Sequence, residues 1–195
     1  KRPYVAPAEE DVRANIAQWQ DLKFGMFIHW GTYSQLGVIE SWTICPELTE
    51  WEYKGRPEGM TYMEYLRFYE HLKDTFNPIH FDPDKWAEAA EYAGMKYVVF
   101  TTKHHDGFNM FDTNLTDYKV TDEGCPFHSN PRSNIAKEVF NSFRAKGLKA
   151  GAYFSIADWH NNDYWWKFFS PKDRYINYDP ARWPEKMTSF EDYVE

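Results

Sequence analysis

The sequence has 195 residues, a formal net charge of −8 and an aromatic content of 19%. No stripe of lysine and arginine forms, which argues against nucleic acids and anionic membranes as partners, and no apolar run approaches the roughly 20 residues that span a membrane. Two cysteines, Cys45 and Cys125, are too few for a disulfide scaffold, and the sequence leaves open whether they pair.

Helix-forming composition, start and stop signals and, in one segment, an apolar stripe predict four helices and the start of a fifth. The pair Asp82-Pro83 marks the start of one helix and Gly94 marks its end. Ser133 is the expected N-cap of another helix. In chain order the predicted helices cover 9–18, 60–74, 84–92 and 133–146, with a further helix beginning at 189–195.

Three apolar runs have the length of strands and do not alternate with polar residues, which predicts strands covered on both faces. They cover 23–28, 96–102 and 148–155. Strands that alternate with helices indicate an α/β fold with a parallel sheet. No internal repeat or linker divides the chain, so we expect one domain or part of one.

Histidines follow all three predicted strands. The first strand leads into His29, the second into His104 and His105, and the third into Asp158 and His160. Because parallel α/β folds carry their sites at the carboxyl ends of the strands, this pattern predicts a functional site there. The remaining histidines, His71, His80 and His128, lie in helical or loop stretches and are expected to be structural.

The residue types alone leave open which chemistry this site performs. A metal-dependent hydrolase would use His29, His104, His105 and Asp106, although adjacent strand residues point to opposite faces, so His104 and His105 converge only where the strand ends. No glycine-rich phosphate loop predicts a nucleotide cofactor, and no Gly-x-Ser-x-Gly elbow is present. The carboxylates at this end are Glu40, Asp106 and Asp158, and none stands out as a nucleophile.

Three motifs carry a resemblance to a known family: residues 23–34, 96–108 and 147–159. In order and content they resemble the α-L-fucosidases of glycoside hydrolase family 29. The resemblance implies a TIM-like (β/α) barrel followed by a β-sandwich, and a closed barrel needs about 250 residues. Residues 1–195 would then be the N-terminal portion of one catalytic domain, holding only the first three βα units.

The resemblance also implies an activity, the retaining hydrolysis of terminal α-linked L-fucose without metal or cofactor. The residues that match fucose-binding positions are His29, Trp42, His104, His105, Tyr153 and Glu40, the last offset by one residue from the family pattern. The nucleophilic Asp and the acid/base Glu would lie C-terminal to Glu195. The expected partners are a fucosylated glycan and the remainder of the same enzyme.

Two other functions stay open: a truncated sugar-binding protein without catalysis, and the metal-dependent hydrolase. A glycan substrate predicts a periplasmic, secreted or lysosomal location. The segments 34–78 and 161–183 are expected to form the rim of the site.

Overall fold

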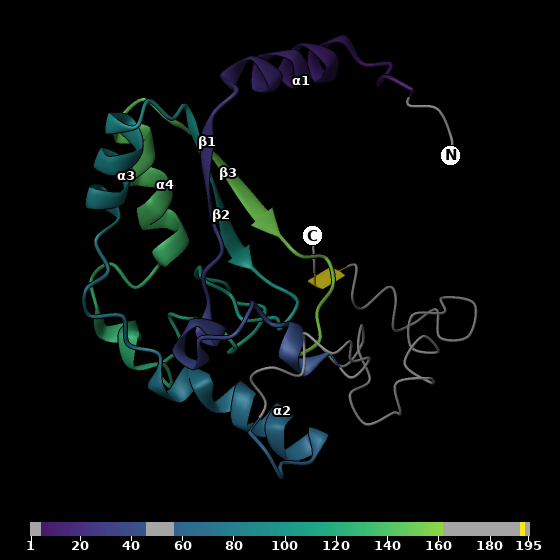
Figure 1. The fold of residues 1–195 in the computed structure, drawn as a ribbon, viewed down its shortest axis with the longest axis vertical. Coiled ribbons are helices and arrows are strands. Elements are labelled where there is room, and N and C mark those ends of the chain that lie inside the picture. The colour runs from purple at the N-terminus through teal and green to yellow at the C-terminus, as the bar shows by residue number, and fades with distance from the viewer. Residues whose placement is uncertain (1–4, 46–56, 162–191, 194–195) are drawn as a thin grey trace.

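The computed structural model describes residues 5–45, 57–161 and 192–193. Its centre is a parallel sheet in the order β1-β2-β3, built from β1 (Gly25–Ile28), β2 (Tyr97–Lys103) and β3 (Lys149–Phe154). Gly25 pairs with Tyr97, and Tyr97 with Lys149, so the three strands begin level with one another. The predicted strands are confirmed, and their carboxyl ends point to the same end of the molecule (Figure 1).

Helical crossovers connect the strands, as parallel pairing requires. The α-helices are α1 (Glu10–Leu22), α2 (Tyr62–Glu70), α3 (Pro83–Tyr92) and α4 (Ile135–Ala145). Short 3₁₀ turns lie at Thr32–Leu36, Trp42–Ile44, His71–Thr75 and Pro126–Ser129. The predicted helix over 60–74 is therefore α2 followed by a 3₁₀ turn. Of the helix predicted over 189–195, only Asp192 and Tyr193 are described, and both are helical.

Capping side chains explain where the helices begin. The Thr61 hydroxyl accepts from the backbone of Glu64, and the Glu64 carboxylate accepts from the backbone of Thr61, a complete capping box for α2. Asp82 caps α3 ahead of Pro83, as the sequence indicates. The prediction for α4 is wrong by one residue: Asn134, not Ser133, is the N-cap, because the Asn134 side chain accepts from the backbone N–H of Lys137.

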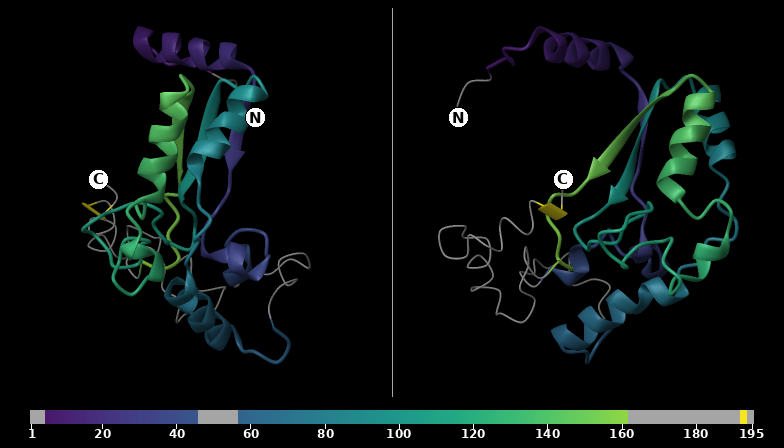
Figure 2. Two further views of the ribbon diagram at one scale, coloured as in Figure 1. Left: turned by 90° about the vertical axis from the view of Figure 1, so that its left-hand side faces the viewer. Right: turned by 180° about the vertical axis from the view of Figure 1, so that it is seen from behind.

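Helices α3 and α4 cover one face of the sheet (Figure 1). The core beneath them joins Val98 and Phe100 of β2 to Ala87 of α3 and to Val139 and Phe143 of α4, all nearly inaccessible to solvent. Helix α1 buries no residue and lies at the end where the strands begin, apart from this layer (Figure 2). None of the described helices is long and apolar enough to cross a membrane.

The expectation that all strands are covered on both faces holds for β2 but is wrong for β1 and β3. In β1 the Phe27 side chain is 55% exposed, and in β3 the Phe154 side chain is 36% exposed. The reason is the face: Met26 and Ile28 pack against the helical core, whereas the alternate residue Phe27 points to the opposite face of the sheet, which α3 and α4 do not cover.

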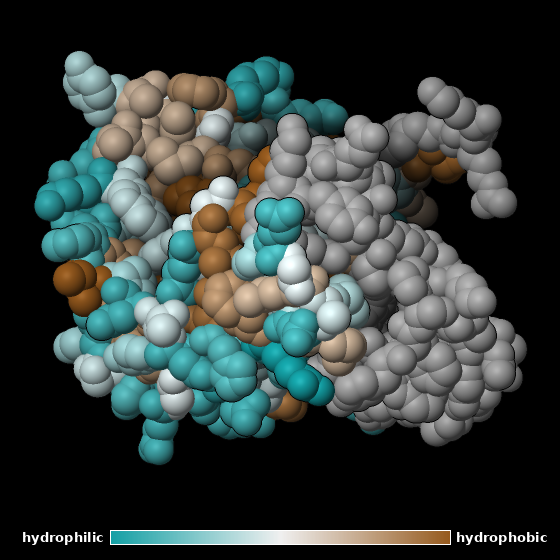
Figure 3. Space-filling model, turned by 60° about the horizontal axis from the view of Figure 1, so that its bottom comes forward, coloured by the Kyte–Doolittle hydropathy of each residue, from teal (hydrophilic) through white to brown (hydrophobic). Residues whose placement is uncertain are grey.

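A second apolar cluster supports the carboxyl end of the sheet. Its buried members come from the turns after β1, from α2 and from the loop after β3: Tyr33, Ile44, Cys45, Tyr65, Leu66, Tyr69, Leu72 and Trp159. Figure 3 brings this end of the molecule forward and shows hydrophobic residues exposed in patches among hydrophilic ones. Cys45 and Cys125 are both buried and are not bonded to each other.

Candidate functional site at the carboxyl edge of the sheet

Three of the four histidines predicted at this end converge, namely His29, His104 and His105, whereas His160 lies apart from them. His29 follows β1, while His104 and His105 follow β2, whose pairing with β3 is irregular between Thr101 and Lys103. The rings of His104 and His105 lie 4.3 Å apart, and that of His29 lies 5.9 Å from His104. Both residues of the His104-His105 pair thus reach the same place because the strand has ended.

Tyr153 and Trp42 complete the aromatic part of the group. Tyr153, on β3, stacks on His104 at a centroid distance of 5.8 Å and lies 5.4 Å from His29. Trp42, in the turn after β1, meets the edge of His105 at 5.0 Å. Three strands and one turn therefore supply one contiguous group.

Glu40 lies at the centre of this group. Its carboxylate is 2.9 Å from Nδ1 of His29 and 3.2 Å from Nε2 of His104, and it accepts from the indole N–H of Trp42 at 3.1 Å. The backbone of Glu40 adopts a positive φ of 50°, unusual for a residue with a side chain. The offset of Glu40 by one residue from the family pattern therefore does not remove it from the site. We call His29, Glu40, Trp42, His104, His105 and Tyr153 the carboxyl-edge cluster.

Burial keeps the two adjacent imidazoles uncharged. It lowers the pKa of His104 to about 3, with further lowering by His105 and His29, and lowers the pKa of His105 to about 4 with help from the charge of Lys103. Burial also raises the pKa of the Tyr153 phenol, and Glu40 adds to the effect. At neutral pH the cluster thus presents the neutral imidazoles of His104 and His105 and a neutral phenol, groups that donate and accept hydrogen bonds.

Two serines fix the tautomers of these imidazoles. A carboxylate only accepts, so Nε2–H of His104 donates to Glu40, and Nδ1 of His104 accepts from the hydroxyl of Ser41 at 2.5 Å. The Ser155 hydroxyl donates to the carbonyl of Ala157, so its oxygen accepts from Nδ1–H of His105, also at 2.5 Å. Nε2 of His105 is left as an acceptor.

Sequence reasoning missed Ser41, Ser155 and Trp159 as parts of the site. The Trp159 ring is 5.0 Å from His105 and 5.6 Å from Trp42, and it is buried. Only Trp159 carried a signal, its place directly after Asp158 beyond the third strand. Ser41 lies 63 positions from His104 along the chain, and Ser155 lies 50 positions from His105. No local sequence pattern reveals contacts between residues so far apart.

The other two carboxylates at this end are engaged elsewhere. Asp106 is buried, accepts from the Tyr69 hydroxyl at 2.7 Å and from the Phe108 backbone, and burial raises its pKa to about 6. Asp158 is buried beside the ammonium group of Lys103, at 3.1 Å. Neither belongs to the cluster, so its one carboxylate among the described residues is Glu40.

A metal ion would find three ligand-type groups here. Atoms of His29, Glu40 and His104 lie within 4.8 Å of one another, the one such group in the described part of the chain. This set differs from the metal site predicted from sequence, because Nδ1 of His105 faces Ser155 and Asp106 faces Tyr69. The three groups already satisfy one another by hydrogen bonds, so they do not require an ion.

The remaining histidines lie apart from the cluster. His71 pairs with Asp74 on the surface, and Nδ1 of His128 faces the carbonyl of Cys125. His160 stacks on Tyr118 and pairs with Glu70. Of the expected rim, residues 46–56 and 162–183 lie outside the described part of the chain.

The fold and the cluster define a class: α/β proteins with a polar ligand site at the carboxyl edge of a parallel sheet. A comparison with protein families then identifies the particular member. The chain belongs to the α-L-fucosidase family, whose model matches residues 1–194.

Known relatives agree with this assignment. The chain is 30% identical over 157 residues to tissue α-L-fucosidase of Homo sapiens, covering 76% of this chain and 31% of that protein. It resembles α-L-fucosidase isoenzyme 1 from Paenibacillus thiaminolyticus, with 37% identity, a TM-score of 0.65, and coverage of 93% of this chain and 39% of that one. It also resembles α-L-fucosidase AlfC from Lactobacillus casei in complex with α-L-fucose product, with 33% identity, a TM-score of 0.57, and coverage of 76% and 43%. The chain thus spans about a third of the human relative's length.

Proposed function

We propose that this chain is the N-terminal part of the catalytic (β/α) barrel of a retaining exo-α-L-fucosidase, and that the carboxyl-edge cluster binds the fucose ring. One observation carries the proposal: His29, Glu40, His104, His105 and Tyr153 converge from three parallel strands and the following turn into one contiguous group. Membership of the α-L-fucosidase family supports L-fucose as the sugar that is bound.

The chemistry of the cluster suits a sugar with several hydroxyl groups. Nε2 of His105 and the Glu40 carboxylate accept hydrogen bonds, and the Tyr153 phenol both donates and accepts. The ring of Trp42 offers an apolar face to the carbon skeleton. Because the imidazoles of His104 and His105 are neutral, these two rings bind hydroxyls without attracting anions.

The reacting groups are proposed to lie further along the protein. A retaining glycosidase needs a nucleophilic carboxylate and a carboxylic acid about 5–5.5 Å apart. Asp106 and Asp158 are buried and bonded to Tyr69 and Lys103, which supports placing the nucleophilic Asp and the acid/base Glu C-terminal to Glu195. In this arrangement the residues described here hold and orient the sugar.

The proposed partners are a fucosylated glycan and the rest of the same polypeptide. Glycans of this kind occur outside the cytosol, which favours a periplasmic, secreted or lysosomal enzyme. A sugar-binding protein without catalysis would use the same cluster, so only turnover separates the two functions.

The test uses the full-length protein and an aryl α-L-fucoside. We expect release of the phenol, and ¹H NMR during the first turnovers should show α-L-fucose as the initial anomer. Initial formation of the β-anomer would contradict retention. Binding of L-fucose without turnover would establish the sugar-binding function instead, and neither binding nor turnover would refute the proposal.

A further inference from the structure

Lys103, the last residue of β2, immediately precedes His104 and His105 of the carboxyl-edge cluster. Its side chain is 0% exposed, an unusual place for an ammonium group. Its Nζ donates to Asp158 Oδ2 at 3.1 Å and to the carbonyl of Ala157 at 3.4 Å, and it lies 4.7 Å from the Phe154 ring centre. All three partners belong to β3 or to the loop that follows it, so Lys103 ties that loop to the end of β2.

The second carboxylate oxygen of Asp158, Oδ1, holds the loop after β3 in shape. Oδ1 accepts from the backbone of His160 at 3.0 Å and of Asn161 at 2.9 Å, which folds the loop into a turn. Gly107 shows how closely this turn approaches the loop after β2: a Cβ there would collide with the Asp158 side chain. Its φ of +79° also favours glycine.

This loop is what holds His105. The backbone N–H of Trp159 donates to the carbonyl of His105 at 2.6 Å, and the Ser155 hydroxyl accepts from the His105 ring. Ser155 is oriented by the Ala157 carbonyl, the same group that Lys103 contacts. The chain of contacts from Lys103 to the His105 tautomer is therefore continuous.

Stability alone does not account for this pair. Side chains that are 0% and 1% exposed have lost their hydration, and well-packed apolar residues often replace such pairs without loss of stability. Lys103 also influences the protonation of His105: its positive charge is the second cause, after burial, of the lowered pKa of His105.

We propose that Lys103 and Asp158 are positioning residues, which fix the loop after β3 so that His105 and Trp159 keep their place and His105 keeps its tautomer. The proposal rests on the proposed function for its kinetic effect. Neither side chain needs to touch the sugar, since both are covered by the residues that they hold.

The experiment compares three forms of the full-length enzyme. Lys103→Met leaves the buried Asp158 carboxylate without a positive charge beside it, with only the Tyr193 hydroxyl donating to Oδ2 at 3.3 Å, so its Tm should fall. Lys103→Met combined with Asp158→Asn removes both charges and keeps the oxygen that caps the turn, so its Tm should return toward the wild-type value. Its kcat/KM for an aryl α-L-fucoside should nevertheless stay about ten- to a hundredfold below wild type, as expected when a binding group is misplaced.

A matched control is the partly buried pair of Lys73 and Asp122, whose Nζ and Oδ1 atoms are 2.9 Å apart and which lies outside the cluster. The corresponding double variant, Lys73→Met with Asp122→Asn, should keep wild-type kinetics. If kcat/KM recovers together with Tm in the Lys103–Asp158 double variant, the pair is merely structural and the proposal is overturned. Should that variant not fold, Lys103→Gln with Asp158→Asn serves instead, because it also removes both charges while it keeps polar groups and the capping oxygen at these positions.

A second readout does not depend on catalysis. In full-length protein with ¹⁵N-labelled histidine, His105 should carry its proton on Nδ1, and the double variant should show a mixture of tautomers. His105→Gln assigns the signal. An unchanged tautomer would overturn the proposal, whereas an inactive wild-type protein with the expected tautomer change would refute only the fucosidase function.

Discussion

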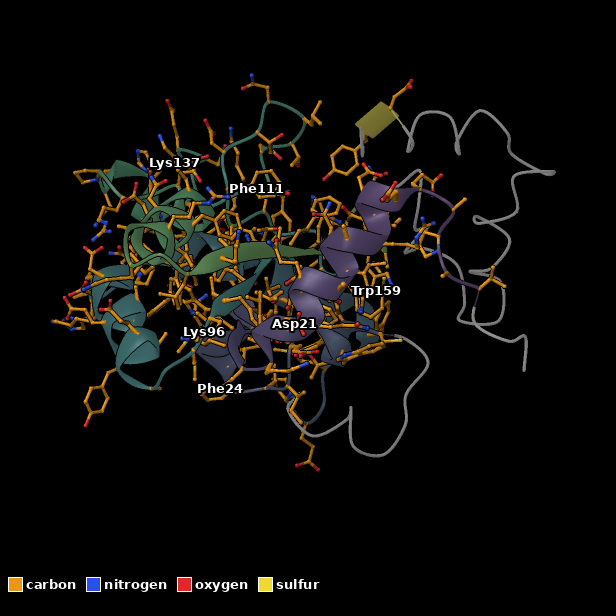
Figure 4. All side chains as sticks on the ribbon, turned by 90° about the horizontal axis from the view of Figure 1, so that it is seen from above. Asp21, Phe24, Lys96, Phe111, Lys137 and Trp159 are labelled. Carbon is orange, nitrogen blue, oxygen red and sulfur yellow. The ribbon has the colours of Figure 1, made fainter. Side chains whose placement is uncertain are left out.

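Two lysine–aspartate pairs, at opposite ends of the sheet, show what the fold does with the same residue types. At the amino end, Lys23 and Asp21 lie 3.5 Å apart with side chains 75% and 84% exposed. Figure 4 looks at the molecule from this end and labels Asp21, Phe24 and Lys96. At the carboxyl end, Lys103 and Asp158 are completely buried.

The exposed pair and the buried pair differ in what they can do. An exposed pair contributes roughly 0–1 kcal/mol and is screened by salt. A buried charge, by contrast, changes the pKa of its neighbours, as Lys103 does for His105. Ionisable groups are therefore informative about function where the fold removes them from water, which here is the carboxyl end alone among the described strand ends.

The largest effect should come from removing the rest of the protein. Residues 1–195 expressed alone should release no phenol from an aryl α-L-fucoside, because the described carboxylates of this end are held by histidines, Tyr69 or Lys103. Turnover clearly above that of a His104→Ala control would show that Asp106 or Asp158 is the nucleophile. The carboxyl end would then hold the reaction as well as the sugar.

Truncation within the carboxyl-edge cluster should have the next largest effect. His29→Ala or His105→Ala in the full-length enzyme should lower kcat/KM by about one to three orders of magnitude, since contacts that tighten in the transition state supply a few kcal/mol. Lys96→Ala and Lys149→Ala, at the amino end, are the matched controls and should stay near wild type. Equal losses at both ends would remove the distinction between them.

The same contrast should appear in stability. Tyr69→Phe removes a 2.7 Å hydrogen bond to the buried Asp106 carboxylate, so the free energy of unfolding should fall by about 1–3 kcal/mol. Lys23→Ala should change it by less than about 0.5 kcal/mol. Denaturant titration of the full-length protein measures both, and a similar cost for the two variants would contradict the argument from burial.

His104 and His105 should contribute little pH dependence to sugar binding. In the folded protein, the pKa of His104 is about 3 and that of His105 about 4, so both rings stay neutral as pH rises from 5 to 8. Calorimetry should therefore find these histidines adding no change in the Kd of L-fucose over that range, with weakening only below about pH 4. A step near pH 6.5, the value of an exposed imidazole, that is lost in His105→Gln would show that this ring is hydrated.

The smallest expected effect is that of a chelator. His29, Glu40 and His104 satisfy one another by hydrogen bonds, and carboxylate chemistry needs no metal. EDTA followed by dialysis should leave kcat/KM within about twofold of the untreated enzyme. Loss of activity that zinc restores would establish the metal-dependent hydrolase instead.

The sequence predicted the parts of this site that depend on chain direction. Parallel strands end at one edge, so His29, His104 and His105 were expected to meet, and the structure brings them together. The position of Glu40 depends on a positive φ that no spacing rule indicates. Ser41 and Ser155 reach the histidines through tertiary contacts, which one-dimensional patterns do not record.

The errors in the fold have similar causes. An apolar run indicates that a strand is buried in the complete sheet, but not which neighbours cover it, so Phe27 was expected inside and is half exposed. The cap of α4 depends on which of two adjacent polar residues accepts from the first turn, and Asn134 does so.

The exposed side of β1 has a consequence for biosynthesis. A nascent polypeptide that has left the ribosome only as far as β3 would present Phe24 and Phe27, 50% and 55% exposed, beside a strand edge that pairs with no other strand among the described residues. Translation adds about 5–20 residues per second, so such an intermediate would persist for seconds and attract chaperones or other unfinished chains. Synthesis speed and chaperone supply should therefore govern the yield of the recombinant protein.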